Sequence, residues 1–252
     1  MFILLLVKID EASRPDCLRL HPTAPTVVGL DAARRAAAGR PGPRRRLVLP
    51  GWQDGAATRV KAQALLQTLN ATLLSNPSAT RTLQQWCGDH KLAPEARIRA
   101  LRDTATRKPA DAEIRSQLRV GADEPIGYRR VQLACGDRVL SEADNWYVPS
   151  RLTVEMNRLL DTSDTPFGTA VKALNFTRRT ESAKLLWSPL PQGWETRPLP
   201  TADAGRGLDI PEQVLQHRAV LYKDGNTPFS LVVETYRRDL FAFALNPQEN
   251  GR

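Results

Sequence analysis

Two charged side chains, Arg130 and Glu234, lie within apolar segments where they could bind a ligand. The planar guanidinium of an arginine can hold a carboxylate through two parallel hydrogen bonds. Glu234 stands in the segment SLVVETY, where burial would raise its pKa or require a basic partner. Two structural interpretations stay open: a solvated strand arginine, and an edge-strand glutamate that discourages aggregation.

No other catalytic pattern competes with these two residues. The sequence contains no GxSxG elbow, no Walker loop and no GxGxxG motif, and its serines have no identifiable base partner. The three histidines show no metal-ligand spacing: His21, His90 and His217. We therefore expect no metal site.

The three cysteines, Cys17, Cys87 and Cys135, form neither a CxxC motif nor a Cys-His ligand spacing. A zinc site is therefore not supported. Cys87 and Cys135 each follow apolar residues and precede Gly-Asp. For both we favour a buried free thiol over a disulfide.

Two predicted β-hairpins carry the arginine and the glutamate. The runs 128–134 and 139–148 are separated by the turn sequence CGDR, and the runs 219–222 and 229–237 by a segment that contains KDGN. Asp-Gly between apolar runs is a strong hairpin signal. Pro149 ends the first hairpin, because proline cannot donate to a strand ladder.

Helices are expected before and between the hairpins. Leucines at helical spacing predict helices over 57–75 and 79–88, separated by Asn76-Pro77. The remaining elements are a strand at 96–104, a short helix at 111–118, a helix capped by Thr153, a DTPFG elbow at 164–168, a strand at 175–187, a loop at 188–209 and a helical turn at 210–215. This order predicts an α+β fold, with an antiparallel sheet of about six strands and helices on one face.

These elements resemble the chorismate pyruvate-lyase family over roughly residues 57–243. The resemblance is carried by Arg130, the CGD turn, the VP that closes the second strand, the TPFG elbow and the last hairpin with Glu234. It implies an enzyme that eliminates pyruvate from chorismate to leave 4-hydroxybenzoate, without a metal or an organic cofactor, in a site enclosed beneath helical flaps. Arg130 would anchor the ring carboxylate, and Glu234 would act at the oxygen on the far side.

The same resemblance implies four further residues at the ligand. Ala79 replaces a methionine of the family, and Asn145 replaces an arginine, which weakens the expectation that a dianion binds tightly. Phe167 replaces a leucine beside a backbone N–H that can donate to a carboxylate, and a core role for its ring is the alternative. For Arg218, which resembles an arginine before the last hairpin, a surface position is the alternative.

A second interpretation is a protein that binds without catalysis. The lyase fold is shared with the UTRA sensor domain of GntR-type regulators, so the resemblance also implies a sensor or carrier of a small aromatic carboxylic acid. Residues 1–50 are too few to fold a winged-helix DNA-binding domain, which argues against a complete regulator. Fold resemblance does not fix function.

Basic charge is concentrated in the first fifth of the chain. The net charge is +9, and residues 1–50 contain nine Lys or Arg and four Asp or Glu. We expect a poorly ordered arm at 1–50 and one lyase-like domain at 51–252.

Basic residues do not alternate with aromatic ones as in nucleic-acid interfaces, and no apolar run is long enough to span a bilayer. We expect a cytoplasmic protein whose partner is an aromatic or cyclohexadiene carboxylate. The uncertain start leaves export open, and the sequence does not determine the oligomeric state.

Overall fold

The computed structural model describes residues 50–199, 201 and 205–245. All of them belong to one compact unit, Arg45–Arg252, whereas a second unit, Met1–Arg44, lies outside the described residues. The expected N-terminal arm therefore also lies outside the described part, apart from residue 50.

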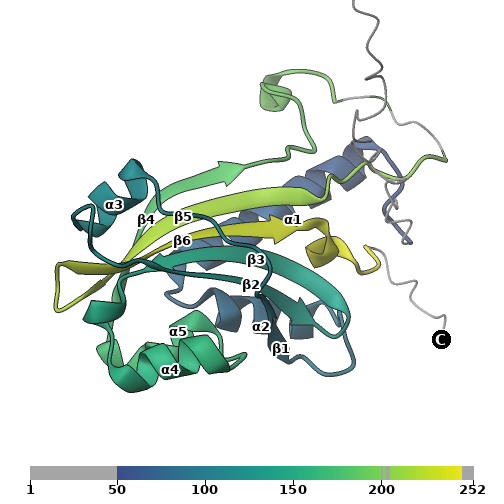
Figure 1. Cartoon of the computed structure of the whole chain (residues 1–252). Coiled ribbons are helices and arrows are strands. Elements are labelled where there is room, and N and C mark those ends of the chain that lie inside the picture. Colours follow the sequence, from purple (N-terminus) through teal and green to yellow (C-terminus); the bar gives the residue numbers. More distant parts are fainter. Residues whose placement is uncertain (1–49, 200, 202–204, 246–252) are drawn as a thin grey trace, which may run out of the picture. The chain divides into compact units, whose positions relative to one another are not determined.

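Six antiparallel strands form one sheet in the order β1-β2-β3-β6-β5-β4 (Figure 1). This sheet, together with the helices packed on it, confirms the predicted α+β class. The strands are β1 (Ile98–Asp103), β2 (Gly127–Cys135), β3 (Arg138–Tyr147), β4 (Thr177–Leu185), β5 (Gln213–Lys223) and β6 (Thr227–Arg237). The edges of the sheet are β1 and β4, so the two predicted hairpins, β2-β3 and β5-β6, form its centre.

The turns of both hairpins have the backbone conformation that their sequences favour. Gly136 joins β2 to β3 with φ of 56°, and Asp224 and Gly225 join β5 to β6 with φ of 49° and 76°. Two successive positive φ values are typical of the Asp-Gly hairpin turn, whose twist matches that of the flanking strands.

The predicted helical turn at 210–215 is wrong, because β5 already begins at Gln213. Val214 and Leu215 are completely buried on the sheet. Their burial outweighs the helix-start preference of Pro211.

Helices form where the leucine spacing predicts them, and side-chain oxygens cap three of them. The helices are α1 (Ala56–Ser75), α2 (Ala79–Asp89), α3 (Ala112–Leu118), α4 (Val154–Thr162) and α5 (Phe167–Ala170), with short 3₁₀ turns at Pro149–Arg151, Lys172–Leu174, Trp194–Thr196 and Arg238–Phe241. Ser78, Asp111 and Thr153 each accept a hydrogen bond from a backbone N–H of the first helical turn.

One face of the sheet carries most of these helices. Leucines of α1 and α2 pack in one core with the buried Tyr236 of β6, and α4 and α5 pack in another around Phe229. The exception is α3, whose Ile114 and Leu118 pack with Trp146 and Leu231. These two strand residues alternate with Asn145 and Val232, so α3 lies on the opposite face.

Candidate ligand-binding site

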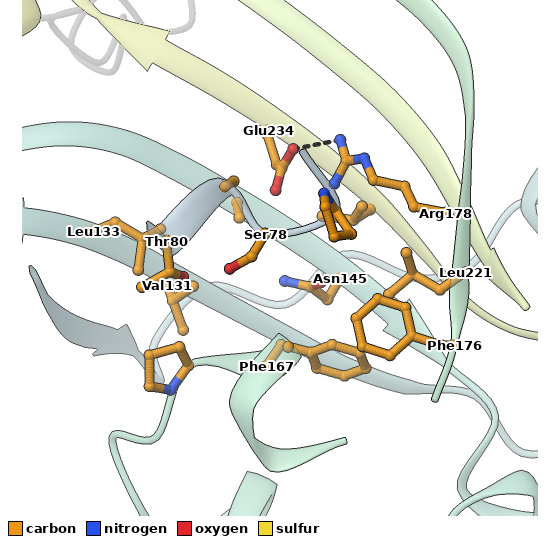
Figure 2. Close-up of a pocket in the computed structure, with 16 residues that line it drawn as sticks. Ser78, Thr80, Val131, Leu133, Asn145, Phe167, Phe176, Arg178, Leu221 and Glu234 are labelled. Atoms are coloured by element: carbon orange, nitrogen blue, oxygen red, sulfur yellow. Dashed lines mark hydrogen bonds and ion pairs between the residues drawn. The ribbon is translucent and has the colours of Figure 1, made fainter. Parts of the chain in front are cut away.

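A cavity of about 90 Å³ lies between the helix-covered face of the sheet and the starts of α2 and α5 (Figure 2). The strands supply Val131, Asn145 and Glu234, and α2 supplies Ala79 and Thr80, preceded by Pro77 and the N-cap Ser78. An open groove of about 460 Å³ adjoins the cavity between α2 and the segment after α5, and the two share Pro77, Ser78, Thr80, Gly168 and Phe176 in their linings.

A buried ion pair forms the polar wall of this cavity. Arg178 of β4 donates a hydrogen bond from Nη2 to Oε2 of Glu234 on β6, at 2.6 Å, and only 10% and 11% of the two side chains are exposed. Burial lowers the pKa of Arg178, but the charge and hydrogen bond of Glu234 more than reverse this and raise it. Glu234 thus has a basic partner, one of the alternatives that its apolar segment left open.

Tyr236 completes the environment of this carboxylate. Its hydroxyl donates to Oε2 of Glu234 at 3.1 Å. Burial raises the pKa of Tyr236 well above its ordinary value, and the negative charge of Glu234 raises it further. The tyrosine therefore stays protonated and acts as a hydrogen-bond donor.

His217, the register partner of Glu234 on β5, extends the buried polar network toward α1. Its Nε2 lies 2.8 Å from Oδ1 of Asn70. Because an amide oxygen only accepts, Nε2 carries the proton, and Nδ1 is left without a partner among the described residues. Burial lowers the pKa of His217, and the positive charge of Arg178 acts in the same direction, whereas Glu234 opposes it.

Asn145 presents an amide to the cavity without a protein partner. It is 3% exposed, and its side chain makes no hydrogen bond to any residue that the structure describes. Figure 2 shows it between Ser78, Glu234 and the Phe167 ring. The first N–H groups of α2, at Ala79 and Thr80, have no acceptor within the helix. A ligand here could use the Asn145 amide together with these N–H groups.

The opposite wall is aromatic and apolar. Phe167 is buried, and its ring lies 5.7 Å from that of Tyr147 and 6.5 Å from that of Phe229. Phe176 and Leu221 also line this wall. Phe167 thus belongs to the core and also forms part of the cavity surface, so both interpretations of its role are compatible with the structure.

The structure brings four of the six predicted site residues together. Glu234, Asn145, Phe167 and Ala79 all line the cavity. Arg218 does not: it points to the α3 side of the sheet, where its Nη2 lies 3.0 Å from Gln117 Oε1 and 3.1 Å from Glu113 Oε1.

Arg130 also lies away from the cavity, on the opposite face of the sheet. It contacts the carboxylates of Glu142, Asp144 and Asp103 at 2.7, 3.3 and 3.5 Å. The expectation that Arg130 and Glu234 grip opposite ends of one ring is therefore not met in this structure. The reason is strand alternation: Arg129, not Arg130, shares the face of Val131 and is buried.

Arg178 is the pocket residue that the sequence analysis missed. It occurs as one of a pair of arginines, Arg178 and Arg179, in the strand that begins at Thr177. The alternation argument applied to Arg129 and Arg130 applies equally here, and an acid that needs a buried partner makes such a pair a candidate.

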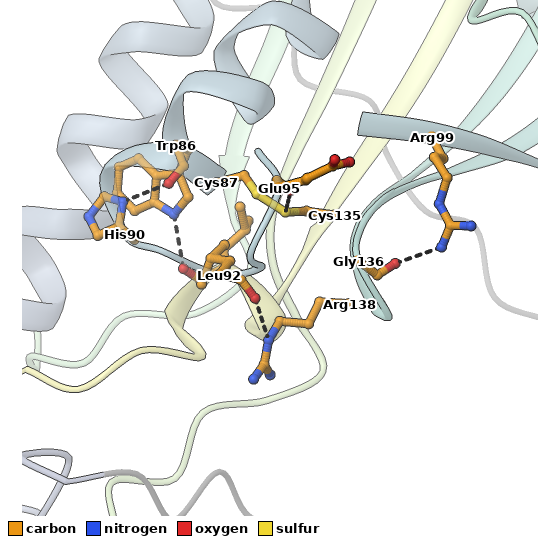
Figure 3. Close-up of a disulfide and its surroundings, with 10 residues drawn as sticks. Trp86, Cys87, His90, Leu92, Glu95, Arg99, Cys135, Gly136 and Arg138 are labelled. Atoms are coloured by element: carbon orange, nitrogen blue, oxygen red, sulfur yellow. Dashed lines mark hydrogen bonds between the residues drawn. A yellow bond between two sulfur atoms is a disulfide. The ribbon is translucent and has the colours of Figure 1, made fainter. Parts of the chain in front are cut away.

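Covalent bonding fixes α2 to the sheet at the end of the helix that is remote from the cavity. Cys87 of α2 and Cys135 of β2 form a disulfide with Cα atoms 6.4 Å apart (Figure 3). The prediction of two free thiols is therefore wrong. The sequence could not reveal the pair, because the cysteines are 48 positions apart and meet only when α2 packs on the sheet.

Within the described residues, no group of three or more His, Cys, Asp or Glu side chains is arranged to hold a metal ion. Within the same residues, no helix is both long and apolar enough to cross a bilayer.

The fold and the cavity define an α+β protein with a buried polar site beneath helices. No protein-family profile matches the chain. It is 54% identical over 194 residues to the uncharacterized protein y4mC of Sinorhizobium fredii (strain NBRC 101917 / NGR234), covering 76% of this chain and 81% of that protein. The chain belongs to the same family as this rhizobial protein.

Solved structures show more distant similarity. The effector domain of PhnF from Mycobacterium smegmatis is 13% identical, with a TM-score of 0.41 over 65% of this chain and 90% of that one. A GntR-family transcriptional regulator from Enterococcus faecalis V583 is 16% identical, with a TM-score of 0.37 over 58% of this chain and 99% of that one.

Proposed function

We propose that the cavity binds a small aromatic carboxylic acid and that the chain acts as a binding protein, a sensor or a carrier, for it. The observation that carries this proposal is the amide of Asn145, which lines the cavity and has no hydrogen-bond partner among the described residues, in a residue that is only 3% exposed. A buried polar group without a partner is costly, so such a group facing a cavity is suited to a ligand. The ring would lie against Phe167 and Phe176, at the apolar wall.

The charge of the cavity disfavours an acid with two carboxylates. Arg178 is already paired with Glu234, and together they carry no net charge. Asn145 is neutral where the lyase resemblance places an arginine, and Arg130 is on the other face of the sheet with three carboxylates of its own. Among the described lining residues no cation is left unpaired for a second carboxylate.

Lyase activity is the second candidate function, and Glu234 supports it. This carboxylate lines the cavity, as the resemblance to chorismate lyases requires. The Tyr236 hydroxyl beside it donates a hydrogen bond to the carboxylate. Elimination of pyruvate from chorismate would need Arg178 to release Glu234 in part, because chorismate carries two carboxylates.

The decisive experiment combines binding and turnover in the same preparation. Purified protein is titrated with 4-hydroxybenzoate by calorimetry, and it is incubated with chorismate while pyruvate and 4-hydroxybenzoate are followed together. Saturable binding without product supports the binding protein. Equal release of both products supports the lyase. If neither binding nor turnover occurs, both proposals are wrong.

Two substitutions locate the bound acid. Asn145→Leu keeps the size of the side chain but removes the amide, so binding should weaken roughly tenfold or more, the usual effect of losing a hydrogen bond to a charged group. Arg130→Gln is the matched control on the other face and should leave the affinity within about twofold. The reverse result, with Arg130 needed and Asn145 dispensable, would place the ligand elsewhere.

A further inference from the structure

A second cavity, of about 310 Å³, lies where β1 and β2 meet the end of α4. It shares no lining residue with the first. Four arginines line it, Arg102, Arg107, Arg129 and Arg130, together with two aspartates, Asp103 and Asp161. This concentration of guanidinium groups is not explained by the function proposed above.

Three of these four arginines lack a carboxylate partner. Arg130 is compensated by the acids described above, but Arg102, Arg107 and Arg129 form no ion pair with any residue in the described ranges. Each bonds only to backbone carbonyls. The bonds are Arg102 Nη1 to Asp161 O at 2.7 Å, Arg107 Nη1 to Thr106 O at 3.1 Å, Arg129 Nη1 to Thr165 O at 2.7 Å and Arg129 Nη2 to Ser163 O at 3.0 Å.

Arg129 is the most informative of the three. It is 4% exposed, and its Nε has no hydrogen-bond partner among the described residues. Burial lowers its pKa, and the nearby positive charge of Arg102 lowers it further. A buried guanidinium that is held by neutral carbonyls alone retains an uncompensated charge, which is costly without a counterion.

The acids of the cavity do not cancel this charge. Asp103 accepts hydrogen bonds from Thr106 and lies 3.5 Å from Arg130. Asp161 accepts a hydrogen bond from Tyr147 at 3.5 Å, and it and Asp164 act on Arg129 only through longer-range attraction. With four arginines and two aspartates among its lining residues, the cavity keeps an excess of positive charge.

We propose that this second cavity binds a phosphate-type oxyanion, as inorganic phosphate or as the phosphate group of a small molecule, on Arg102, Arg107 and Arg129. Planar guanidinium forks match the oxygen geometry of phosphate and can bind it with two parallel hydrogen bonds each. Three arginines suit a dianion with several acceptor oxygens better than a single carboxylate. The inference is independent of the acid proposed for the first cavity.

The test is titration of the full-length protein with inorganic phosphate by calorimetry at constant ionic strength. Saturable binding is expected, and Arg102→Gln and Arg107→Gln should each weaken it roughly tenfold, because each removes a hydrogen bond to a charged ligand. Arg99→Gln is the matched control. Arg99 lies on β1, the strand of Arg102, is exposed, and also donates to a carbonyl, that of Gly136 at 3.0 Å. It should leave the affinity within about twofold.

Further titrations separate a built site from simple charge attraction. Sulfate should compete with phosphate, whereas chloride at equal ionic strength should not. Phenyl phosphate, titrated alongside, shows whether the free ion or an ester is preferred, and either preference supports the proposal. Arg129→Lys keeps the charge but removes the fork, so it should weaken binding while the protein remains folded by circular dichroism. Absence of saturable binding, or an equal loss in Arg99→Gln, overturns the proposal.

Discussion

Two buried arginines of this molecule differ in their hydrogen-bond partners. Arg178 lies beside the first cavity and bonds a buried carboxylate, Glu234, at 2.6 Å. Arg129 lies beside the second cavity and bonds only the backbone carbonyls of Ser163 and Thr165. The pKa of the first is raised by its partner, whereas burial lowers the pKa of the second.

This difference indicates how a binding site for a charged ligand can be recognised. A buried charge that bonds an opposite charge within the protein, as Arg178 bonds Glu234, is compensated, and the polar groups around it can select a ligand with little net charge. A buried charge without such a partner is incomplete and favours a counterion from outside. The buried residue is an arginine in both cases, and only its hydrogen-bond partners differ.

The largest expected effect comes from breaking the complete pair. Glu234→Gln leaves Arg178 buried without a countercharge and should lower the free energy of unfolding by about 3 kcal/mol. The measurement is chemical denaturation, with Glu181→Gln on the exposed face of β4 as the control. Adding Arg178→Met to Glu234→Gln should recover part of the loss, since both charges are then gone. If the double variant is as unstable as the single one, the pair is not the cause.

A smaller effect is expected from removing the unpaired arginine. Arg129→Met leaves the carbonyls of Ser163 and Thr165 without their donors, at a cost of about 1–2 kcal/mol, but it also relieves a buried uncompensated charge. Phosphate should raise the melting temperature of the unmodified protein and should raise that of Arg129→Met much less, because the variant binds phosphate more weakly. Equal stabilisation of both proteins would show that phosphate does not act through Arg129.

The smallest expected effect is a pH dependence of the free energy of unfolding, which arises from His217 beside the pair of Arg178 and Glu234. His217 faces Glu234 of β6, Arg178 of β4, the ring of Tyr236 and Asn70 of α1. Its pKa in the folded state is lowered from the ordinary value of 6.5, so below that pH the unfolded chain binds the extra proton first. The free energy of unfolding should therefore fall as the pH drops below 6.5 and continue to fall until the folded-state pKa is reached.

The measurement is denaturation between about pH 5 and about pH 7 in the original protein and in His217→Gln. The variant should show a flatter dependence over this range. An unchanged slope would assign the effect to other groups, and a slope of the opposite sign would contradict the neutral, buried state of His217.

Most of the fold could be predicted from the sequence because the signals were local, and the exception is the start of β5, which was expected as a helical turn at 210–215. The Asp-Gly turn, the caps at Ser78 and Thr153, and the spacing of leucines each act within a few residues of the element that they define. The need of Glu234 for a basic partner was also visible in its apolar strand. The other predicted residues that line the cavity, Ala79, Asn145 and Phe167, came from the resemblance to the chorismate lyase family and not from these local signals.

The rest depended on which strands meet and which way a side chain points. In a strand, neighbouring residues face opposite sides, so Arg129 and Arg130 point to different faces of the sheet, and neither lines the first cavity. The partner of Glu234 comes from β4, which lies two strands away in the sheet. The unpaired state of Arg129 could not be inferred either, since it depends on the absence of a nearby carboxylate in three dimensions.

The disulfide between Cys87 and Cys135 closes a ring of the chain that includes most residues of the second cavity but few of the first. It closes a ring of the main chain that contains Arg102, Arg107 and Arg129, whereas Arg178 and Glu234 lie outside it. A protease that cut the exposed chain at Arg107 would therefore open the ring without releasing a fragment, and the cut would be visible on a gel only after reduction. Reduction itself would add freedom to the unfolded ring, at a cost of roughly 2–4 kcal/mol in stability. The second cavity is thus lined mostly by residues of a covalently closed ring of the chain, whereas the first cavity is lined mostly by residues outside that ring.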